Sequence, residues 1–332
     1  MTVTLFEAGI GADRALVLAD GAPVQAHFER HEGVRVGSIH GARLVKRLER
    51  RGIVALAGGE EALLQPLPAV TEGSVLRVEV VREALPEAGR PRLPKVRAVF
   101  GFPPRAVGEL AAGPDLRARL PMVTLVGGPG PDRLEEAGWG EVVALAQSGH
   151  LPFPGGLLTI TPTPAMTVID VDGPGEPLAL AEAAATAVAR ALRLFDIGGG
   201  IVVDFPSLQG RAARTRLDGV LAEALAGLGA HERTATNGFG LVQIVRPRLR
   251  SSLIEQVRAP GFGALELLRR AAREAPGPCS LILHPREAAW LATRPALTDA
   301  LACVRGGAVG LRADPAMAIA AGDVVPGQTP GL

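Results

Sequence analysis

Two apolar stretches that each end in aspartate lie on either side of a helical pattern. They are TVIDVDG, Thr167 to Gly173, and GGGIVVDF, Gly198 to Phe205. Between them, LALAEAAATAVARALRLFD (residues 178–196) is rich in alanine and leucine, which predicts a long helix. A strand, a helix and a second strand in this order predict a right-handed crossover with the two strands parallel and adjacent. The stretch GLVQIVRPRL (residues 240–249) predicts a further strand of the same α/β unit.

The segments outside this unit predict a chain of several domains. Residues 1–30 are expected to form short strands with turns, and the many short strands with Gly-rich turns in residues 34–98 are typical of a small barrel. Residues 104–113 are expected to form one helix, and RLEEAGWGEVVALAQSG a helix broken near Gly138. After residue 260, helix and strand patterns alternate and predict a separate small α/β unit, in which residues 286–302 form a single helix.

Composition sets limits on the class of protein. A net charge of +1 over 332 residues gives no global field that favours nucleic acid. The two cysteines, Cys279 and Cys303, form no CxxC pair, so neither a disulfide framework nor a cysteine-rich zinc site is expected. No apolar run of about 18 residues occurs, so no membrane span is expected. We therefore expect a soluble, cytoplasmic protein.

Asp170 and Asp204 end the two strands of the predicted crossover. Neighbouring strands lie about 4.8 Å apart, so both carboxylates are expected at the same edge of one sheet. Mg²⁺ commonly takes one or two protein carboxylates and keeps several waters, and Asp172 could orient such a water. Aspartates at strand ends also serve turns, and Asp172 begins a DGPG sequence typical of turns. On this pattern alone, a metal site and a pair of turn residues remain equally open.

Three segments carry a resemblance to a known family: AMTVIDVDG, ARALRLFDIGGGIVVDF and FGLVQIVRPRLRSSL. In content and order they resemble the core of the ribonuclease E/G family, and the similarity covers about residues 150–256. The resemblance implies that Asp170 and Asp204 are the two Mg²⁺-binding aspartates. It places Asp172 where the family has asparagine, as a third catalytic residue.

The resemblance also implies a domain arrangement of the α/β class. A ribonuclease H-like subdomain would comprise residues 1–35 plus about 100–155, and an OB-type RNA-binding barrel would occupy residues 36–98. A deoxyribonuclease I-like catalytic subdomain would cover residues 156–258. The helix and strand pattern after residue 260 adds a small C-terminal α/β domain, residues 262–332. The family's cysteine-zinc link and most of its sensor for RNA 5′ ends are absent from this sequence, so neither zinc nor a zinc-linked dimer is expected.

Several basic and aromatic residues are candidates for RNA contact. If the strand after Gly240 continues, Arg246, Arg248 and Arg250 alternate along one face and could hold phosphates, although a solvated edge strand has the same pattern. The resemblance favours RNA contact for Arg246 and Arg248. Further RNA-binding candidates are Phe239, as a stacking residue, Arg193 on the predicted helix, and Arg43 and Arg47 in the predicted barrel.

The function that the resemblance implies is Mg²⁺-dependent endoribonuclease action on single-stranded RNA, leaving 5′-phosphate and 3′-hydroxyl ends. Two alternatives remain open. One is an RNA-binding protein that has lost catalysis, and the other is a metal-dependent phosphoesterase that acts on small nucleotides.

Overall fold

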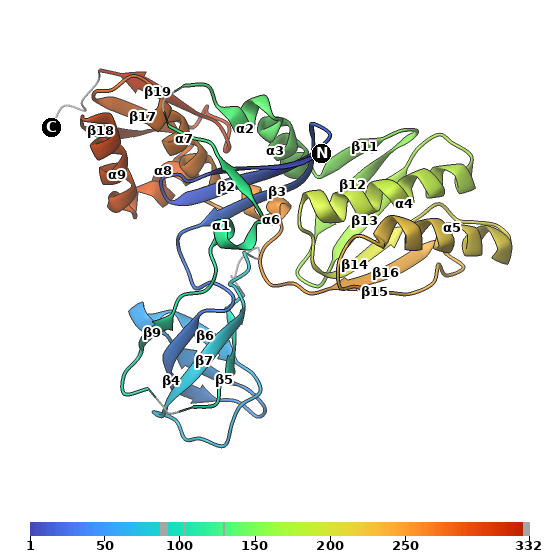
Figure 1. The fold of residues 1–332 in the computed structure, drawn as a ribbon, viewed down its shortest axis with the longest axis horizontal. Coiled ribbons are helices and arrows are strands. Elements are labelled where there is room, and N and C mark those ends of the chain that lie inside the picture. Colours follow the sequence, from blue (N-terminus) through green and yellow to red (C-terminus); the bar gives the residue numbers. More distant parts are fainter. Residues whose placement is uncertain (87–91, 102–103, 129, 328–332) are drawn as a thin grey trace. The chain divides into compact units, whose positions relative to one another are not determined.

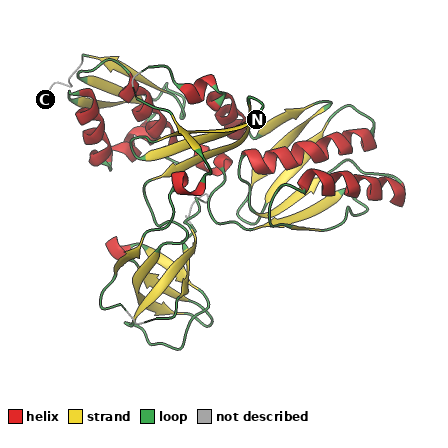
Figure 2. Cartoon of the chain, viewed as in Figure 1, coloured by secondary structure: helices red, strands yellow, loops and turns green. Residues whose placement is uncertain are grey.

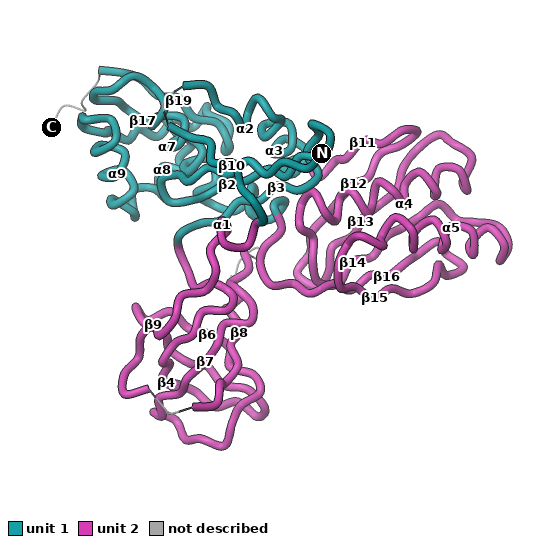
Figure 3. The backbone as a smooth tube through the Cα atoms, viewed as in Figure 1, with its two compact units in different colours: residues 1–31, 121–148, 253–332 teal, residues 32–120, 149–252 magenta. Residues whose placement is uncertain are grey.

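The computed structural model describes residues 1–86, 92–101, 104–128 and 130–327. The chain is a mixed α/β protein that groups into two compact units (Figure 3). Unit 1 contains residues 1–31, 121–148 and 253–332. Unit 2 contains residues 32–120 and 149–252.

The first part of unit 2 is a closed five-stranded β-barrel, which confirms the barrel predicted from the Gly-rich strand pattern. Its strands pair in the order β5-β6-β8-β7-β4, and β4 closes the ring by pairing with β5. Their side chains fill the interior with buried aliphatic residues such as Leu44, Val54 and Val80. That this barrel is of the OB type stays a prediction. The strands are β4 (Ile39–Arg47), β5 (Gly52–Ala55), β6 (Glu61–Leu64), β7 (Val75–Arg82) and β8 (Lys95–Ala98), with a 3-10 turn, η1 (Ala57–Gly59).

The prediction of a helix at residues 104–113 is wrong. This segment contains strand β9 (Gly108–Ala111), which pairs antiparallel with β4 outside the barrel ring. Glu109, Leu110 and Ala111 are residues that favour helices. Here they form a strand, because pairing with β4 outweighs their weak intrinsic helix propensity.

The second part of unit 2 is a six-stranded sheet in the order β11-β12-β13-β14-β16-β15. Only β13 and β14 are parallel neighbours; the other adjacent pairs are antiparallel. The predicted strand–helix–strand crossover is thereby confirmed (Figure 1). The elements are β11 (His150–Phe153), β12 (Gly156–Pro162), β13 (Thr167–Asp172), α4 (Pro177–Leu194), β14 (Gly199–Asp204), α5 (Gly210–Leu225), β15 (Glu232–Arg233) and β16 (Leu241–Arg246).

The two faces of this sheet differ in exposure. Helices α4 and α5 pack against each other, and α4 packs on β11, β12 and β13 (Figure 2). Alternate strand residues face the helices and are buried: Ile169, Val171, Ile201, Val203, Val242 and Ile244. Their neighbours in sequence point to the opposite face and are exposed or half-buried. We call this second side the open face of the sheet.

Helix α4 begins and ends where its sequence dictates. The Glu176 carboxylate accepts a hydrogen bond from the Ala179 N–H at 2.9 Å, and Pro177 occupies the first turn, where no backbone donor is needed. Alanines on one side of the helix are fully buried and allow close approach to the sheet. The helix ends at Leu194, and Gly199 in the left-handed region (φ 91°) starts the return strand β14.

Unit 1 is built on a four-stranded sheet in the order β10-β1-β2-β3. A tight hairpin turn joins β2 and β3, in which Asp20 (φ 49°) and Gly21 (φ 82°) take left-handed conformations. The predicted break at Gly138 is also confirmed, since two helices meet at that residue (φ 97°). The elements are β1 (Thr2–Glu7), β2 (Ala12–Ala19), β3 (Ala22–Arg30), β10 (Val123–Leu125), α2 (Arg133–Glu136) and α3 (Trp139–Ser148); α1 (Leu116–Arg119) belongs to unit 2.

The C-terminal part of unit 1 is a three-stranded sheet, β18-β17-β19, with helices packed on it. The prediction of a single helix at residues 286–302 is wrong. The first helix ends before Thr293 and Arg294, and a second helix starts at Pro295. Proline has no N–H to donate to the previous turn. The elements are α6 (Leu253–Arg258), α7 (Phe262–Arg273), β17 (Cys279–Leu283), α8 (Pro285–Ala292), α9 (Pro295–Arg305), β18 (Val309–Ala313) and β19 (Gly322–Pro326).

The predicted division into four domains is finer than these two units and stays a prediction. So do the ribonuclease H-like and deoxyribonuclease I-like assignments. The segment 253–332 groups with the N-terminal sheet of unit 1 rather than forming a compact unit of its own.

Candidate metal and RNA site

The two strand-terminal aspartates lie directly beside each other. In the parallel pair β13–β14, Asp170 is the register partner of Asp204. Neighbouring strands are about 4.8 Å apart, so the two side chains leave the backbone close enough to share one cation. Both residues are exposed on the open face, because Ile169 and Val203, the residues before them, are fully buried on the helix-covered face.

Asp172 joins this pair from the same strand and the same face. Two residues after Asp170, it is exposed, and its carboxylate lies within interaction distance of Asp170. The pKa of Asp170 is raised, first by partial loss of hydration of its carboxyl against the sheet, then by the negative charges of Asp172 and Asp204. A site that concentrates negative charge in this way gains stability when a divalent cation binds.

The donor set suits a hydrated hard cation. Within the described ranges of the chain, no group of three or more His, Cys, Asp or Glu side chains could enclose a metal ion. The described residues therefore do not form a cage of protein ligands around a metal ion. Two adjacent carboxylates on an open face fit the way Mg²⁺ is commonly held, through one or two carboxylates with waters in its other positions. Asp170 and Asp204 fit this role.

Phe239 lies near the same end of the sheet. The turn before β16 is held by the Asn237 side chain, whose Oδ1 accepts the N–H groups of Phe239 (2.9 Å) and Leu241 (3.1 Å). Leu241 is the register partner of Asp204. Phe239 precedes it by two residues and is 79% exposed, so the turn presents an aromatic ring to solvent close to the carboxylates.

Arg246 lies at the other end of the sheet and is engaged by the fold. Its guanidinium donates to the carbonyls of Leu192 (3.1 Å), Ile197 and Leu228 (3.4 Å). These carbonyls belong to the last turn of α4 and to the segments that follow α4 and α5. Burial lowers the pKa of Arg246. Its positive charge is thus used to satisfy carbonyls where α4 and α5 end.

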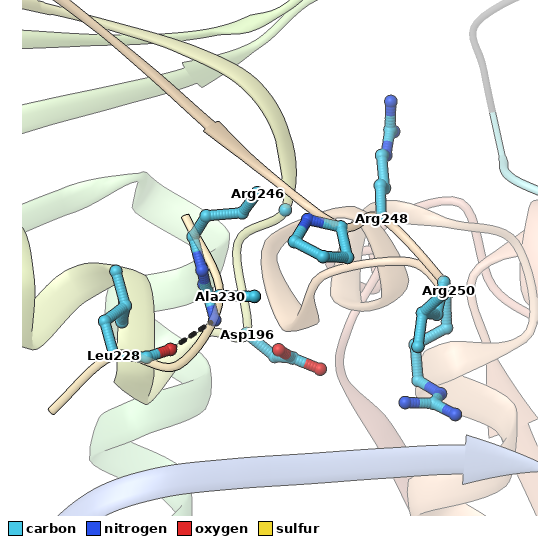
Figure 4. A pocket seen from close by; sticks show the side chains of 9 residues that line it. Asp196, Leu228, Ala230, Arg246, Arg248 and Arg250 are labelled. Atoms are coloured by element: carbon cyan, nitrogen blue, oxygen red, sulfur yellow. Dashed lines mark hydrogen bonds between the residues drawn. The ribbon is translucent and has the colours of Figure 1, made fainter. Parts of the chain in front are cut away.

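The premise that Arg246, Arg248 and Arg250 share one strand face is wrong. Strand β16 ends at Arg246, and Pro247, which cannot donate to a strand partner, follows it. The three arginines line a pocket of about 190 Å³ together with Asp196. Figure 4 shows that their guanidinium groups point in different directions: Arg246 reaches toward the Leu228 carbonyl, and the other two extend away from it.

Arg193 belongs to this arginine end as well. Its Nη2 donates to the Ala224 carbonyl at 2.7 Å and ties the end of α4 to the end of α5. We call the group Arg193, Arg246 and Arg248 the arginine end of the sheet, and Asp170, Asp172 and Asp204 the carboxylate end.

Register and alternation separate the two ends. Arg246 pairs with Gly199 at the start of β14, whereas Asp204 ends that strand five residues later, which corresponds to about 16 Å along the strand. Arg246 also alternates with the exposed Val245 and points to the helix-covered side, away from the face that carries the aspartates. Phe239 is therefore the predicted RNA contact that lies nearest the carboxylates, and the arginines lie elsewhere. Their RNA contacts stay predictions.

The two barrel candidates are exposed on the outside of β4. Arg43 Nη1 donates to the Gly73 carbonyl at 2.8 Å, and Arg47 Nη1 donates to the Val70 carbonyl. Both side chains therefore lie along the loop before β7 with their charges open to solvent. Contact with RNA backbone stays a prediction for both.

Sequence analysis missed a charged cavity in unit 1. Arg14 is only 1% exposed and forms ion pairs with Glu7 (2.8 Å) and Glu266 (3.2 Å) beside a cavity of about 350 Å³. Arg269 and Arg273 line the same cavity and also pair with Glu7. The positive and negative charges are matched, so we assign this cluster to holding unit 1 together. In ADRALVLA, Arg14 directly precedes a run of five apolar residues, and this position could have indicated that Arg14 is buried.

A comparison with known protein families gives a match in the segment that contains the six-stranded sheet. Residues 142–249 match the model of the Ribonuclease E/G family. This match contains the whole six-stranded sheet, its two helices, and both the carboxylate and the arginine end. At the level of the family, it supports a ribonuclease that acts on RNA.

A search for membrane-spanning segments was negative: none of the helices within the described residues is both long and apolar enough to cross a bilayer. Across residues 142–249, the chain is similar to the ribonuclease E/G family.

Proposed function

We propose that this protein is a Mg²⁺-dependent endoribonuclease that cleaves single-stranded RNA to 5′-phosphate and 3′-hydroxyl ends. The observation that carries the proposal is the in-register pair Asp170 and Asp204 on the open face of a sheet that matches a ribonuclease family.

The exposed position of the pair suits a long substrate. Helices α4 and α5 do not cover the strands on the open face, and Asp170 and Asp204 are exposed there. A phosphodiester inside an RNA chain can therefore reach Asp170 and Asp204 without a free end. This accessibility favours endonucleolytic cleavage over an enclosed site for a small nucleotide.

The chain's own residues have distinct roles in this proposal. Asp170 and Asp204 hold the cation, and Asp172 orients a water by accepting a hydrogen bond from it. When bound, Mg²⁺ polarises the scissile phosphate and lowers the pKa of a bound water. Phe239 stacks on a base next to the cleaved bond and fixes the register of the strand. The barrel residues Arg43 and Arg47 hold backbone phosphates elsewhere on the RNA.

The charge of Asp172 has two opposing consequences. It strengthens attraction for a divalent cation, and it repels the RNA phosphate that must approach the same point. A neutral amide at this position would weaken the first effect and remove the second. We therefore propose that the charge of Asp172 determines the Mg²⁺ concentration that cleavage requires.

A fluorescent single-stranded RNA oligomer incubated with and without Mg²⁺ tests the proposal, with Asp170→Asn and Asp204→Asn as variants. We expect cleavage by the wild type only with Mg²⁺ and none by either variant. Equal cleavage by all three proteins would show that the site is elsewhere. Binding of the oligomer without cleavage would identify an RNA-binding protein, and cleavage of mononucleotide esters alone would identify a small-molecule phosphoesterase.

A further inference from the structure

Strand β16 carries a row of side chains on the open face next to the carboxylates. Leu241, Gln243 and Val245 alternate with the buried Val242 and Ile244, so they point to the same side as Asp204. Leu241 pairs with Asp204, and Gln243 pairs with Val202 on β14. The row therefore begins at the carboxylate end and leads away from it along the sheet.

Gln243 is the polar member of this row and lies within reach of the carboxylate end. It is the diagonal cross-strand neighbour of Asp204, a relation that places Cβ atoms about 7–8 Å apart and allows long side chains to meet. A group bound at Asp204 and a neighbouring group of the same ligand can therefore contact both side chains at once.

The backbone of Gln243 is fixed by two hydrogen bonds to Thr234. Its N–H donates to Thr234 Oγ1 at 3.0 Å, and its carbonyl accepts from the Thr234 N–H at 2.9 Å. The residue is exposed, and no hydrogen bond to its carboxamide is found among the residues that the structure describes. A rigid backbone thus presents an amide with donors and an acceptor to the open face.

The surroundings of this amide are apolar. Val202 on β14 is half-buried beside it, and Val245, one step further along β16, is 48% exposed. Methyl groups around a single amide form a surface on which the flat face of a base can lie while its edge is hydrogen-bonded. A glutamine amide can pair with two positions of a base edge at once.

We propose that Gln243 is a specificity-determining residue that recognises the base on one side of the cleaved phosphodiester. Phe239 and Gln243 flank Leu241 along the chain, so the two side chains receive the bases on opposite sides of the phosphate held at Asp204. Phe239 stacks without regard to base identity, whereas Gln243 distinguishes bases by their hydrogen-bonding edges. This inference rests on the proposed RNA cleavage at Asp170 and Asp204.

The test uses short end-labelled RNA oligomers, and the products are resolved by length so that the rate of cleavage at one bond is measured by itself. The four bases are placed in turn at each position next to that bond. Cleavage rates are measured with Mg²⁺, and dissociation constants with Ca²⁺ for the same oligomers. The proteins are wild type, Gln243→Met, which keeps the length and removes the amide, Gln243→Glu, and Gln147→Met as a control in unit 1.

We expect the wild type to prefer one base at one flanking position by about tenfold or more, as a bidentate contact allows. Gln243→Met loses that preference and keeps Mg²⁺-dependent cleavage, Gln243→Glu changes which base is preferred, and Gln147→Met behaves as wild type. An unchanged base preference in Gln243→Met, or no preference in the wild type, would overturn the inference while leaving the proposed function standing.

The two failures are distinguishable. If the wild type does not cut any oligomer, the proposed function fails, and the dissociation constants measured with Ca²⁺ then decide about Gln243. Loss of a base preference in binding in Gln243→Met would support recognition of RNA by this residue, and equal binding profiles would overturn it.

Discussion

The carboxylate end and the arginine end of the six-stranded sheet use charge in opposite ways. At the carboxylate end, Asp170 and Asp204 are adjacent, exposed and like-charged. At the arginine end, Arg246 is largely engaged by backbone carbonyls where α4 and α5 end. Charge that the fold leaves unneutralised can act on a ligand, whereas charge that the fold has paired mainly stabilises the fold. We therefore expect function to depend on the first end and stability on the second.

The largest expected effect concerns the carboxylate end. Asp170→Asn or Asp204→Asn should reduce RNA cleavage by about a thousandfold, since a metal site supplies several kcal/mol of transition-state stabilisation. Urea denaturation should show no loss of stability, because both side chains are exposed and the substitution removes like-charge repulsion. A variant that unfolds more easily and loses activity in proportion would contradict the assignment.

The next effect concerns the arginine end. Arg246→Met should lower the free energy of unfolding by about 2–4 kcal/mol, because it leaves partly buried carbonyls without a donor. Urea denaturation measures this, with Arg190→Met on the exposed side of α4 as the matched control. If Arg246→Met is as stable as the wild type and binds RNA with a smaller salt dependence, Arg246 is an RNA ligand and the comparison between the ends fails.

Phe239→Ala tests whether this exposed ring contributes to RNA binding rather than to stability. Loss of one stacked base should weaken RNA binding by about 1–3 kcal/mol. Stability should not change, because the ring is 79% exposed. Fluorescence anisotropy with a labelled oligomer in Ca²⁺ measures the affinity. Retained affinity together with a lower unfolding free energy would show that the ring packs in solution instead.

Asp172→Asn tests how much the charge of Asp172 contributes to Mg²⁺ binding at the carboxylate end. The substitution removes one of the negative charges that raise the pKa of Asp170, and it lowers the charge of the cation site. The Mg²⁺ concentration for half-maximal cleavage should rise several-fold, because cation affinity follows the charge of the ligand set. Cleavage at saturating Mg²⁺ should persist, and its complete loss would make Asp172 an obligatory ligand.

The smallest effects lie away from the sheet. Each of Arg43→Ala and Arg47→Ala should reduce the slope of log affinity against log salt concentration by about 0.7, the value for one phosphate of single-stranded RNA. Cleavage should also be equally fast for oligomers with 5′-monophosphate and 5′-hydroxyl ends, because the resemblance to the family implies that most of its sensor for 5′ ends is missing. A strong preference for the monophosphate would show that a sensor exists.

The carboxylate end could be predicted from the sequence because it depends on local pattern and one topological rule. Two apolar strands separated by a long helix fix a parallel pair, and the two aspartates at matching ends then become register partners. Each step uses residues close together in the chain, and the structure confirms the adjacency of Asp170 and Asp204.

The arginine end could not be predicted in the same way. The alternation of Arg246, Arg248 and Arg250 indicates a shared face only if the strand continues, and Pro247 was the signal that it ends. That Arg246 would meet the carbonyls of Leu192 and Leu228 depends on how α4 and α5 finish against the sheet. Such a contact is a property of tertiary packing. The same reason explains why the strand β9 was missed. Its sequence favours a helix, but pairing with β4 holds it in an extended conformation.

The central claim is that Asp170 and Asp204 jointly hold one divalent cation. Isothermal titration of Mg²⁺ into the wild type, Asp170→Asn, Asp204→Asn and the double variant tests it most directly. The account predicts one Mg²⁺ per wild-type chain and a strongly non-additive cycle, in which either single substitution weakens binding about as much as both together. Wild-type affinity in both single variants, or independent and additive losses, would contradict it.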